Sequence, residues 1–274
     1  MTFSTQAVDG AGVAISASGN LMAVAGRGIF ISTNQGAAWR TADVSTTVNW
    51  NCVAASADGR FIVADADAIG PFYSTNAGLT WAEASSSFAA DMIVGTADGT
   101  RVVAGNTQFL YVSCDAGQTW SVRPPPDPAH FNVRTAMALS RDGSLLLVGW
   151  HGQYFASADL AVSWRQIGYV QNPQLAYLYL AVACSGDGTS LFAATPKFAT
   201  ATLPPNLKIT PAPNQLVLSW PWPSSRYALQ QSPDLSSMSW GDVTNNIIVT
   251  NYRNQVVLSR SAAQAFYRLQ GPNP

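Results

Sequence analysis

One eight-residue pattern recurs four times in this chain of 274 residues. It consists of a serine, an Asp or Asn two positions later, a small residue two further on, and a closing Trp. The serine and Asp/Asn oxygens can accept hydrogen bonds from backbone N–H groups of a turn, and a glycine supplies the positive φ that a tight turn needs. The pattern therefore predicts a strand, a turn and a second strand that begins at the Trp. The copies are Ser32–Trp39, Ser74–Trp81, Ser113–Trp120 and, with alanine in place of glycine, Ser157–Trp164.

A second unit precedes each copy and also occurs once more, after the last copy. It is a β-rich run, a polar turn that ends in glycine, and another β-rich run. Asp-Gly between two such runs is a strong hairpin signal. The turn glycines are residues 19, 59, 99, 143 and 188, which gives steps of 40, 40, 44 and 45 residues. Each repeat therefore predicts four antiparallel strands, and such four-stranded units repeated along a chain are typical of propeller blades.

The eight-residue pattern resembles the Asp-box, or BNR, repeat of sialidase-like β-propellers. Five hairpins but only four boxes are present, and Thr2-Phe3-Ser4 aligns with Thr119-Trp120-Ser121. We therefore expect an all-β fold in which residues 1–203 form a five-bladed β-propeller. The N-terminal strand would close the ring by completing the blade whose other strands run from Val182 to about Thr202, which removes a sheet edge. The box tryptophans are expected in the core.

The periodicity ends at a proline-rich connection around residues 203–213. Beyond it, Leu-Ser-Trp, Tyr-x-Leu-Gln and Phe-Tyr-Arg-Leu elements lie in short β-rich runs. These elements resemble a fibronectin type III-like module of the kind found in secreted bacterial proteins, over about residues 207–271. We expect residues 204–274 to form a small β-sandwich. The alternative is an additional blade, in which Ser232-Pro233-Asp234 before Trp240 is a degenerate box.

Composition bears on partners and compartment. A net charge of −1 with 11% charged residues disfavours a nucleic-acid partner, and the chain has no apolar run of about 18 residues that would span a membrane. The three cysteines lack metal-site spacing, and Asn34 and Asn76 replace the box aspartates, so no cofactor or metal is predicted. Residues 1–5 lack a signal-peptide pattern. An extracellular or cell-surface location is nevertheless favoured by the resemblance, and the oligomeric state stays open.

Catalysis is disfavoured by the placement of the carboxylates. The sialidase resemblance implies an arginine triad, a Tyr/Glu pair and an Asp acid, but the Arg-Ile-Pro type motif before the first box is missing. The one glutamate, Glu83, falls in an outer strand. Glycoside hydrolysis ordinarily needs two placed carboxylates, and the nearest pair, Asp65 and Asp67, is more typical of a solvated loop. No catalytic residue is predicted.

Boxes and glycine turns share one face of the predicted propeller, so the remaining connections share the other. Those connections are rich in aromatic rings beside polar side chains, a combination that suits stacking on a sugar or contact with a protein. Some rings, Trp50 and Tyr179 first, would alternatively plug the centre of a narrow ring. The predicted ligand-binding residues are Trp50, Phe131, Arg134, Trp150, His151, Tyr177 and Tyr179.

Three functions are open at this point. The first is a non-catalytic module that binds a glycan or surface polymer through the face opposite the boxes, by analogy with lectin-like propellers. The first alternative is a protein-interaction scaffold or assembly factor. The second alternative is a sialidase-like glycoside hydrolase. The ligand of the favoured function is therefore expected to be a glycan, with a protein partner as the alternative.

Overall fold

The computed structural model describes residues 12–44, 48–66, 69–127, 136–150, 153–169, 181–194, 198–202, 205–221, 227–234, 240–250, 253–259 and 265–271. All regular structure in these residues is β-strand. The strands form antiparallel sheets, several of them four-stranded. This confirms the prediction of an all-β fold built from four-stranded units.

Each of the first four repeats forms one sheet in which the strands lie side by side in chain order. Sheet 1 contains β1 (Gly12–Ile15), β2 (Met22–Ala25), β3 (Ile29–Ser32) and β4 (Arg40–Thr41). Sheet 2 contains β5 (Trp50–Ala55), β6 (Ile62–Ala66), β7 (Gly70–Ser74) and β8 (Ala82–Glu83). Sheet 3 contains β9 (Met92–Gly95), β10 (Val102–Gly105), β11 (Leu110–Ser113) and β12 (Ser121–Arg123). Sheet 4 contains β13 (Ala136–Leu139), β14 (Leu146–Trp150), β15 (Gln153–Ser157) and β16 (Arg165–Tyr169).

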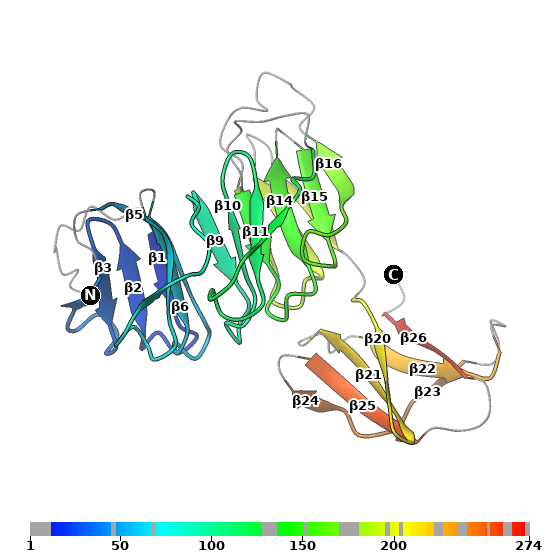
Figure 1. Ribbon diagram of the computed structural model, residues 1–274. Coiled ribbons are helices and arrows are strands. Elements are labelled where there is room, and N and C mark those ends of the chain that lie inside the picture. Colours follow the sequence, from blue (N-terminus) through cyan, green and yellow to red (C-terminus); the bar gives the residue numbers. More distant parts are fainter. Residues whose placement is uncertain are drawn as a thin grey trace.

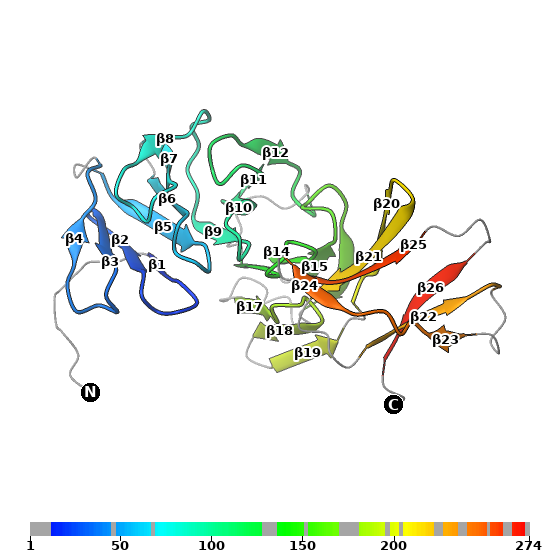
Figure 2. The same ribbon diagram turned by 90° about the horizontal axis from the view of Figure 1, so that it is seen from below.

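Sheet 5 has three described strands, β17 (Ala181–Cys184), β18 (Ser190–Ala194) and β19 (Phe198–Thr202). The five sheets follow one another along an arc that begins at sheet 1 and ends at sheet 5 (Figures 1 and 2). Thr2-Phe3-Ser4, the strand predicted to complete the fifth blade, lies outside the described residues. Closure of a five-bladed ring therefore stays a prediction.

Successive sheets are joined through their first strands and through the turn that follows each first strand, called here the first turn. The contacts run from β1 to β5, β9, β13 and β17 in order. One backbone hydrogen bond of 2.8 Å joins each pair of first turns: Ala17 donates to Ala57, Ala57 to Ala97, Ala97 to Arg141, and Arg141 to Gly186. This repeated bond fixes the spacing of neighbouring sheets at one end of the strands.

A hydroxyl side chain organises each first turn from within. In sheet 2, Ser56 Oγ donates to Asp58 Oδ1 at 2.5 Å and accepts the Phe61 N–H at 3.0 Å. Asp58 Oδ1 also accepts the Arg60 N–H at 2.9 Å. Thr96, Ser140 and Ser185 make the corresponding bonds in sheets 3, 4 and 5. The Asp-Gly pairs in the sequence thus mark turns whose backbone donors are satisfied by their own side chains.

The cores lie between neighbouring sheets, so the two ends of the arc leave a face uncovered. The side chain four residues after the first-turn glycine is at most 2% exposed in sheets 1 to 4, where it is Ala23, Val63, Val103 and Leu147. The same position in sheet 5 is Phe192, which is 51% exposed. On sheet 1, Val13 is 78% exposed, although its counterparts Val53, Ile93 and Met137 are buried.

The eight-residue boxes form capped turns between the third and fourth strands. In sheet 3, Ser113 Oγ donates to Asp115 Oδ1 at 2.8 Å, and Asp115 Oδ1 accepts the Thr119 N–H at 2.9 Å. Trp120 is half-buried at the margin of the core between sheets 2 and 3, and its indole N–H donates to the Gly117 carbonyl at 2.9 Å. Trp81 and Trp164 are likewise half-buried at the margins of cores, whereas Trp39 is half-buried outside the core clusters. The prediction that the box tryptophans lie in the core therefore holds only at the margins of the cores.

The C-terminal segment forms two sheets that share one core (Figure 1). The core contains Leu218, Trp220 and Val256 from one sheet and Leu229 from the other. The fibronectin type III-like assignment and the boundary at residues 203 and 204 stay predictions. One sheet contains β20 (Lys208–Ala212), β21 (Gln215–Pro221), β25 (Arg253–Ser259) and β24 (Ile248–Thr250), and the other contains β23 (Gly241–Asp242), β22 (Ala228–Ser232) and β26 (Phe266–Gln270).

The degenerate box considered for an additional blade begins at the last residue of β22. The Asp234 N–H donates to Ser232 Oγ at 3.3 Å, much as the Asp115 N–H donates to Ser113 Oγ at 3.4 Å. The serine nevertheless belongs to the three-stranded sheet of the C-terminal module. A box-like turn can therefore start outside the repeats.

Candidate binding site

The structure places two of the predicted ligand-binding residues in the core. Trp50 and Trp150 are fully buried, Trp50 between sheets 1 and 2 and Trp150 between sheets 3 and 4. Trp50 makes an edge contact with Phe72 at a ring-centroid distance of 5.4 Å. Neither indole can stack on a ligand without opening the core. Phe131, Arg134, His151, Tyr177 and Tyr179 lie outside the described residues, and their role in binding stays a prediction.

The carboxylates considered for catalysis have structural surroundings where they are described. Asp65 is fully buried and accepts the Ala90 N–H at 2.6 Å. Glu83 is exposed in β8, and Asp67 lies outside the described residues. Hydrogen bonds from the Ser163 side chain and backbone hold the pKa of Asp159 below its ordinary value. Asp159 Oδ1 accepts the Ser163 N–H and the Ser157 hydroxyl proton, both at 2.8 Å, so this carboxylate caps its own box turn.

The junction between sheets 1 and 2 shows how a box packs on the preceding sheet. Gly78 of the second box has a φ of +74°, and a Cβ added there would lie 2.1 Å from Ile31 Cδ1 on sheet 1. Arg40, the residue after Trp39, donates from Nη2 to the Ala77 carbonyl at 3.0 Å. The backbone of one box therefore lies directly on the sheet before it, and a side chain of that sheet binds a turn carbonyl.

The next junction repeats this arrangement with a different donor. The Ser85 N–H, which follows β8 of sheet 2, donates to the Gln118 carbonyl in the third box at 3.0 Å. The box also bonds to the first turn of its own sheet, because the Ala116 N–H donates to the Thr100 carbonyl at 2.9 Å. Each of these two boxes thus has a donor from the preceding sheet and an acceptor from its own sheet.

The junction between sheets 4 and 5 contains a cavity of about 320 Å³, called here the junction cavity. Its walls are the fourth box, the first turns of sheets 4 and 5, and the connection at Pro205 and Asn206. The sequence after β19 contains no box, so no box turn of sheet 5 occupies this space. The cavity is a consequence of an incomplete repeat beside a complete one.

Repeat positions show which part of a box would occupy the junction cavity. Ala156 immediately precedes the fourth box as Ile31 precedes the first, and Arg165 follows Trp164 as Arg40 follows Trp39. Both Ala156 and Arg165 line the cavity. Since Ile31 and Arg40 contact the second box at its glycine and at the preceding carbonyl, the cavity lies where the fifth box would place those atoms.

Two residues of the cavity wall, Trp164 and Arg165, have N–H groups whose surroundings differ from those of their counterparts in other repeats. Arg165 is exposed, and no hydrogen bond or ion pair of its guanidinium is found within the described part of the chain. The Trp164 indole N–H is buried without an acceptor there, whereas its counterparts in the first three boxes donate to a box glycine carbonyl. The accessible guanidinium beside the buried side chains of Leu145 and Ala156 suits a ligand with carbonyl or carboxylate oxygens.

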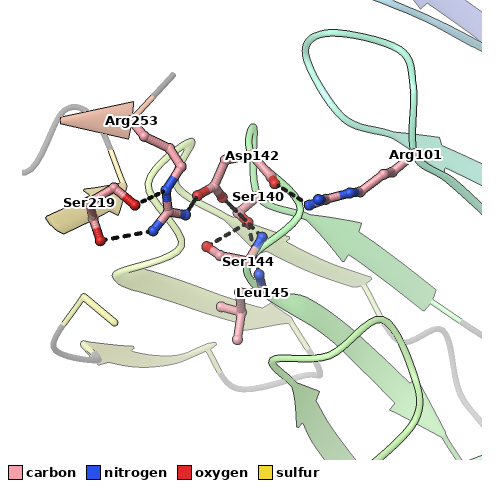
Figure 3. A network of polar contacts seen from close by, with 7 residues as sticks. All are labelled: Arg101, Ser140, Asp142, Ser144, Leu145, Ser219 and Arg253. Carbon is pink, nitrogen blue, oxygen red and sulfur yellow. Dashed lines mark hydrogen bonds and ion pairs between the residues drawn. The ribbon is translucent and has the colours of Figure 1, made fainter. Parts of the chain in front are cut away.

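The C-terminal module touches the first turn of sheet 4 beside this cavity (Figure 3). Arg253 of β25 forms an ion pair with Asp142, whose side chain is 2% exposed. Arg253 also donates to Ser219 Oγ at 3.2 Å and to the Ser219 carbonyl at 3.1 Å. Asp142 Oδ1 accepts the N–H of Ser144, which lines the cavity, at 3.0 Å. The ion pair therefore joins the module to one wall of the cavity.

Sequence reasoning missed Arg165, because the predicted site was the face opposite the boxes. A usable signal was present, since an arginine follows the closing Trp of the first and of the fourth box. The count of five hairpins and four boxes was also visible, but it was interpreted as a missing outer strand. The sequence could not show that a missing box leaves a cavity, because this follows from the way in which each box packs on the preceding sheet.

The residues that the structure describes contain no group of three or more His, Cys, Asp or Glu side chains that could hold a metal ion. Among the same residues there is no helix with the length and apolar character of a membrane span.

No protein-family model and no curated protein matches the chain. Solved structures do match its fold. A structure described as YCF48 bound to D1 peptide has a TM-score of 0.51 and 13% identity, and the match covers 86% of this chain and 82% of that one. An ancestral GH74 enzyme has a TM-score of 0.48 and 17% identity over 78% of this chain and 31% of that one, so this chain spans about a third of the enzyme's length. The YCF48 likeness supports a β-propeller fold for this chain.

Proposed function

We propose that this chain is a non-catalytic binding protein whose ligand is a polypeptide segment of another protein, held in the junction cavity. The observation that carries the proposal is the place of this cavity in the repeat. At the first two junctions a backbone turn occupies the corresponding position and accepts a hydrogen bond from the preceding sheet. A site that otherwise holds polypeptide is matched in shape and donors to polypeptide.

The likeness to YCF48 adds support from outside the chain. That structure is described as bound to a peptide, and it matches most of both chains. At 13% identity the likeness concerns the fold. The likeness favours the alternative of a protein-interaction scaffold. The burial of Trp50 and Trp150 also disfavours glycan binding, because it removes both rings from the aromatic face expected to bind a glycan.

The finer fold assignment is part of the same proposal. We take the propeller to have five blades, with Thr2-Phe3-Ser4 pairing beside β19, and the C-terminal module to be fibronectin type III-like. The glycan alternative keeps the face opposite the boxes as its site, with Phe131, Arg134, His151, Tyr177 and Tyr179. Glycoside hydrolysis is the second alternative, and Asp65 is its described candidate.

A paired screen tests the proposed function on the full chain. A random peptide display library and a glycan array are each applied to the protein and to Ala158→Trp. Ala158 is an exposed residue of the fourth box that lines the cavity, and Thr75→Trp is the matched control at the same position of the second box. We expect selected peptides to bind saturably, Ala158→Trp to weaken them about tenfold or more, and Thr75→Trp to leave them unchanged.

Other outcomes would overturn this proposal. Selective glycan binding that is lost in Phe131→Ala, without peptide binding, would favour the glycan alternative. Turnover of a sialoside or aryl glycoside that survives repurification and is lost in Asp65→Asn would favour hydrolysis. Peptides that bind Ala158→Trp as well as the unchanged protein would place the site outside the cavity.

A further inference from the structure

Arg165 and Arg40 occupy one repeat position in two different surroundings. Arg40 faces an occupied junction and donates to the Ala77 carbonyl of a box turn at 3.0 Å. Arg165 lines the junction cavity, and no box follows it in sheet 5. The geometry of the occupied junction therefore indicates which ligand atom Arg165 would bind, namely a carbonyl oxygen within a turn.

The first turn of sheet 5 supplies the complementary group. In sheets 2 and 3 the residue after the first-turn glycine accepts a box N–H through its carbonyl, as Arg60 does from Ala77 at 2.8 Å and Thr100 from Ala116 at 2.9 Å. Thr189 holds this position in sheet 5, next to Gly188, which lines the cavity. A ligand that bonds to both the Arg165 guanidinium and the Thr189 carbonyl must present a C=O and an N–H on one tight turn.

The floor of the cavity has room for a turn with a small residue at the glycine position of the box. At the occupied junction, Gly78 lies where any added Cβ would contact Ile31. The counterpart of Ile31 at the cavity is Ala156, a smaller side chain in the same place. The cavity can therefore seat a box turn with glycine or alanine at this position, as the fourth box itself does with Ala161 at a φ of +67°.

We propose that the junction cavity binds a box-type turn of a partner protein. The residue that precedes the small residue of this turn makes both bonds: its carbonyl accepts from the Arg165 guanidinium, and its N–H donates to the Thr189 carbonyl. The inference rests on the proposed function and specifies the peptide that the site takes. The partner supplies the third-to-fourth-strand turn that sheet 5 lacks. The interaction is a complementation of the repeat by a turn, related to the addition of a strand to an open sheet.

The probe is a cyclised peptide with the sequence of residues 72–83 of this chain, which contains the second box, labelled with a fluorophore. Fluorescence anisotropy titrations use the full chain, Arg165→Met and the control Arg60→Met, which removes an exposed guanidinium from the first turn of sheet 2. A cyclic peptide of scrambled sequence is the second control. We expect Arg165→Met to weaken binding about tenfold, Arg165→Lys to restore part of it, and Arg60→Met to change it less than twofold.

The outcomes separate this inference from the proposed function. If peptides from the display screen bind but the cyclic box peptide does not, or if Arg165→Met binds it unchanged, the inference is wrong and the proposed function stands. If no polypeptide binds at all, both are wrong. If the full chain self-associates in sedimentation experiments and Arg165→Met abolishes this, a second copy supplies the turn, which overturns the assignment to a different protein.

Discussion

The junction between sheets 1 and 2 and the junction between sheets 4 and 5 use the same repeat but end differently. Both are joined at their first turns by a backbone hydrogen bond of 2.8 Å. At the first junction, the box of sheet 2 also packs on sheet 1 and accepts a bond from Arg40. At the last junction the corresponding space is a cavity of about 320 Å³ beside Arg165.

The comparison separates two tasks within one repeat. The first turns hold neighbouring sheets together and are present at all four junctions. The box turns cover the preceding sheet, whereas sheets 4 and 5 stay joined at their first turns beside a cavity. A repeat protein can thus form a cavity by omitting one element of its last repeat, because each repeat contacts chiefly its neighbours.

The largest expected effect concerns one repeat position, compared between sheets 4 and 5. Leu147→Ala should lower the free energy of unfolding by about 3 to 5 kcal/mol, because this side chain is fully buried between sheets 4 and 5. Phe192 holds the same repeat position in sheet 5 and is 51% exposed, so Phe192→Ala should cost less than about 1 kcal/mol in the open arc. The closed five-bladed ring proposed above predicts a larger cost, because closure would cover this side chain. Urea denaturation of both variants checks this. A cost for Phe192→Ala similar to that for Leu147→Ala would mean that another surface covers sheet 5, as ring closure requires.

A box glycine at the filled junction should have a smaller but clear effect. Gly78→Ala adds a methyl group at 2.1 Å from Ile31 Cδ1 and places alanine at a φ of +74°, so we expect a loss of about 2 to 4 kcal/mol in unfolding free energy. The control is Gly241→Ala, where an added Cβ has no neighbour within 4 Å. Thermal or chemical denaturation measures both. Equal stability of the two variants would show that the box does not pack tightly on sheet 1.

The smallest effect concerns acid stability at a filled junction. Burial raises the pKa of Asp115, but hydrogen bonds from Thr119 and Ser113 outweigh this effect and bring the pKa below the ordinary value of an aspartate. A lowered pKa contributes stability above about pH 4 that is lost as the pH falls through the pKa of the folded state. Asp115→Asn should keep the cap at pH 7, as Asn34 and Asn76 do, within about 1 kcal/mol.

The measurement for this variant is urea denaturation at pH 7, 5 and 3. The unchanged protein should lose more stability than Asp115→Asn between pH 5 and pH 3, since the variant has no proton to bind at this position. Identical losses would contradict the assignment of acid sensitivity to this carboxylate.

Much of the fold was determined by the sequence alone. Positive-φ turns and their caps are local, because the hydrogen bonds of Ser113, Asp115 and Thr119 join residues within one box. Local patterns therefore predicted the strand pairs and the four-stranded units. The turn chemistry of Asp58 and its neighbours is local in the same way.

The candidate binding site was decided by the tertiary structure. Trp50 and Trp150 follow a pattern that suited an exposed aromatic face, but contacts between neighbouring sheets bury both rings. Arg40 and Arg165 are alike in local sequence, and they differ because a box from the next sheet reaches the first and none reaches the second. The contacts that a side chain makes with another repeat join residues that are far apart in the sequence. A local sequence pattern contains no information about such contacts.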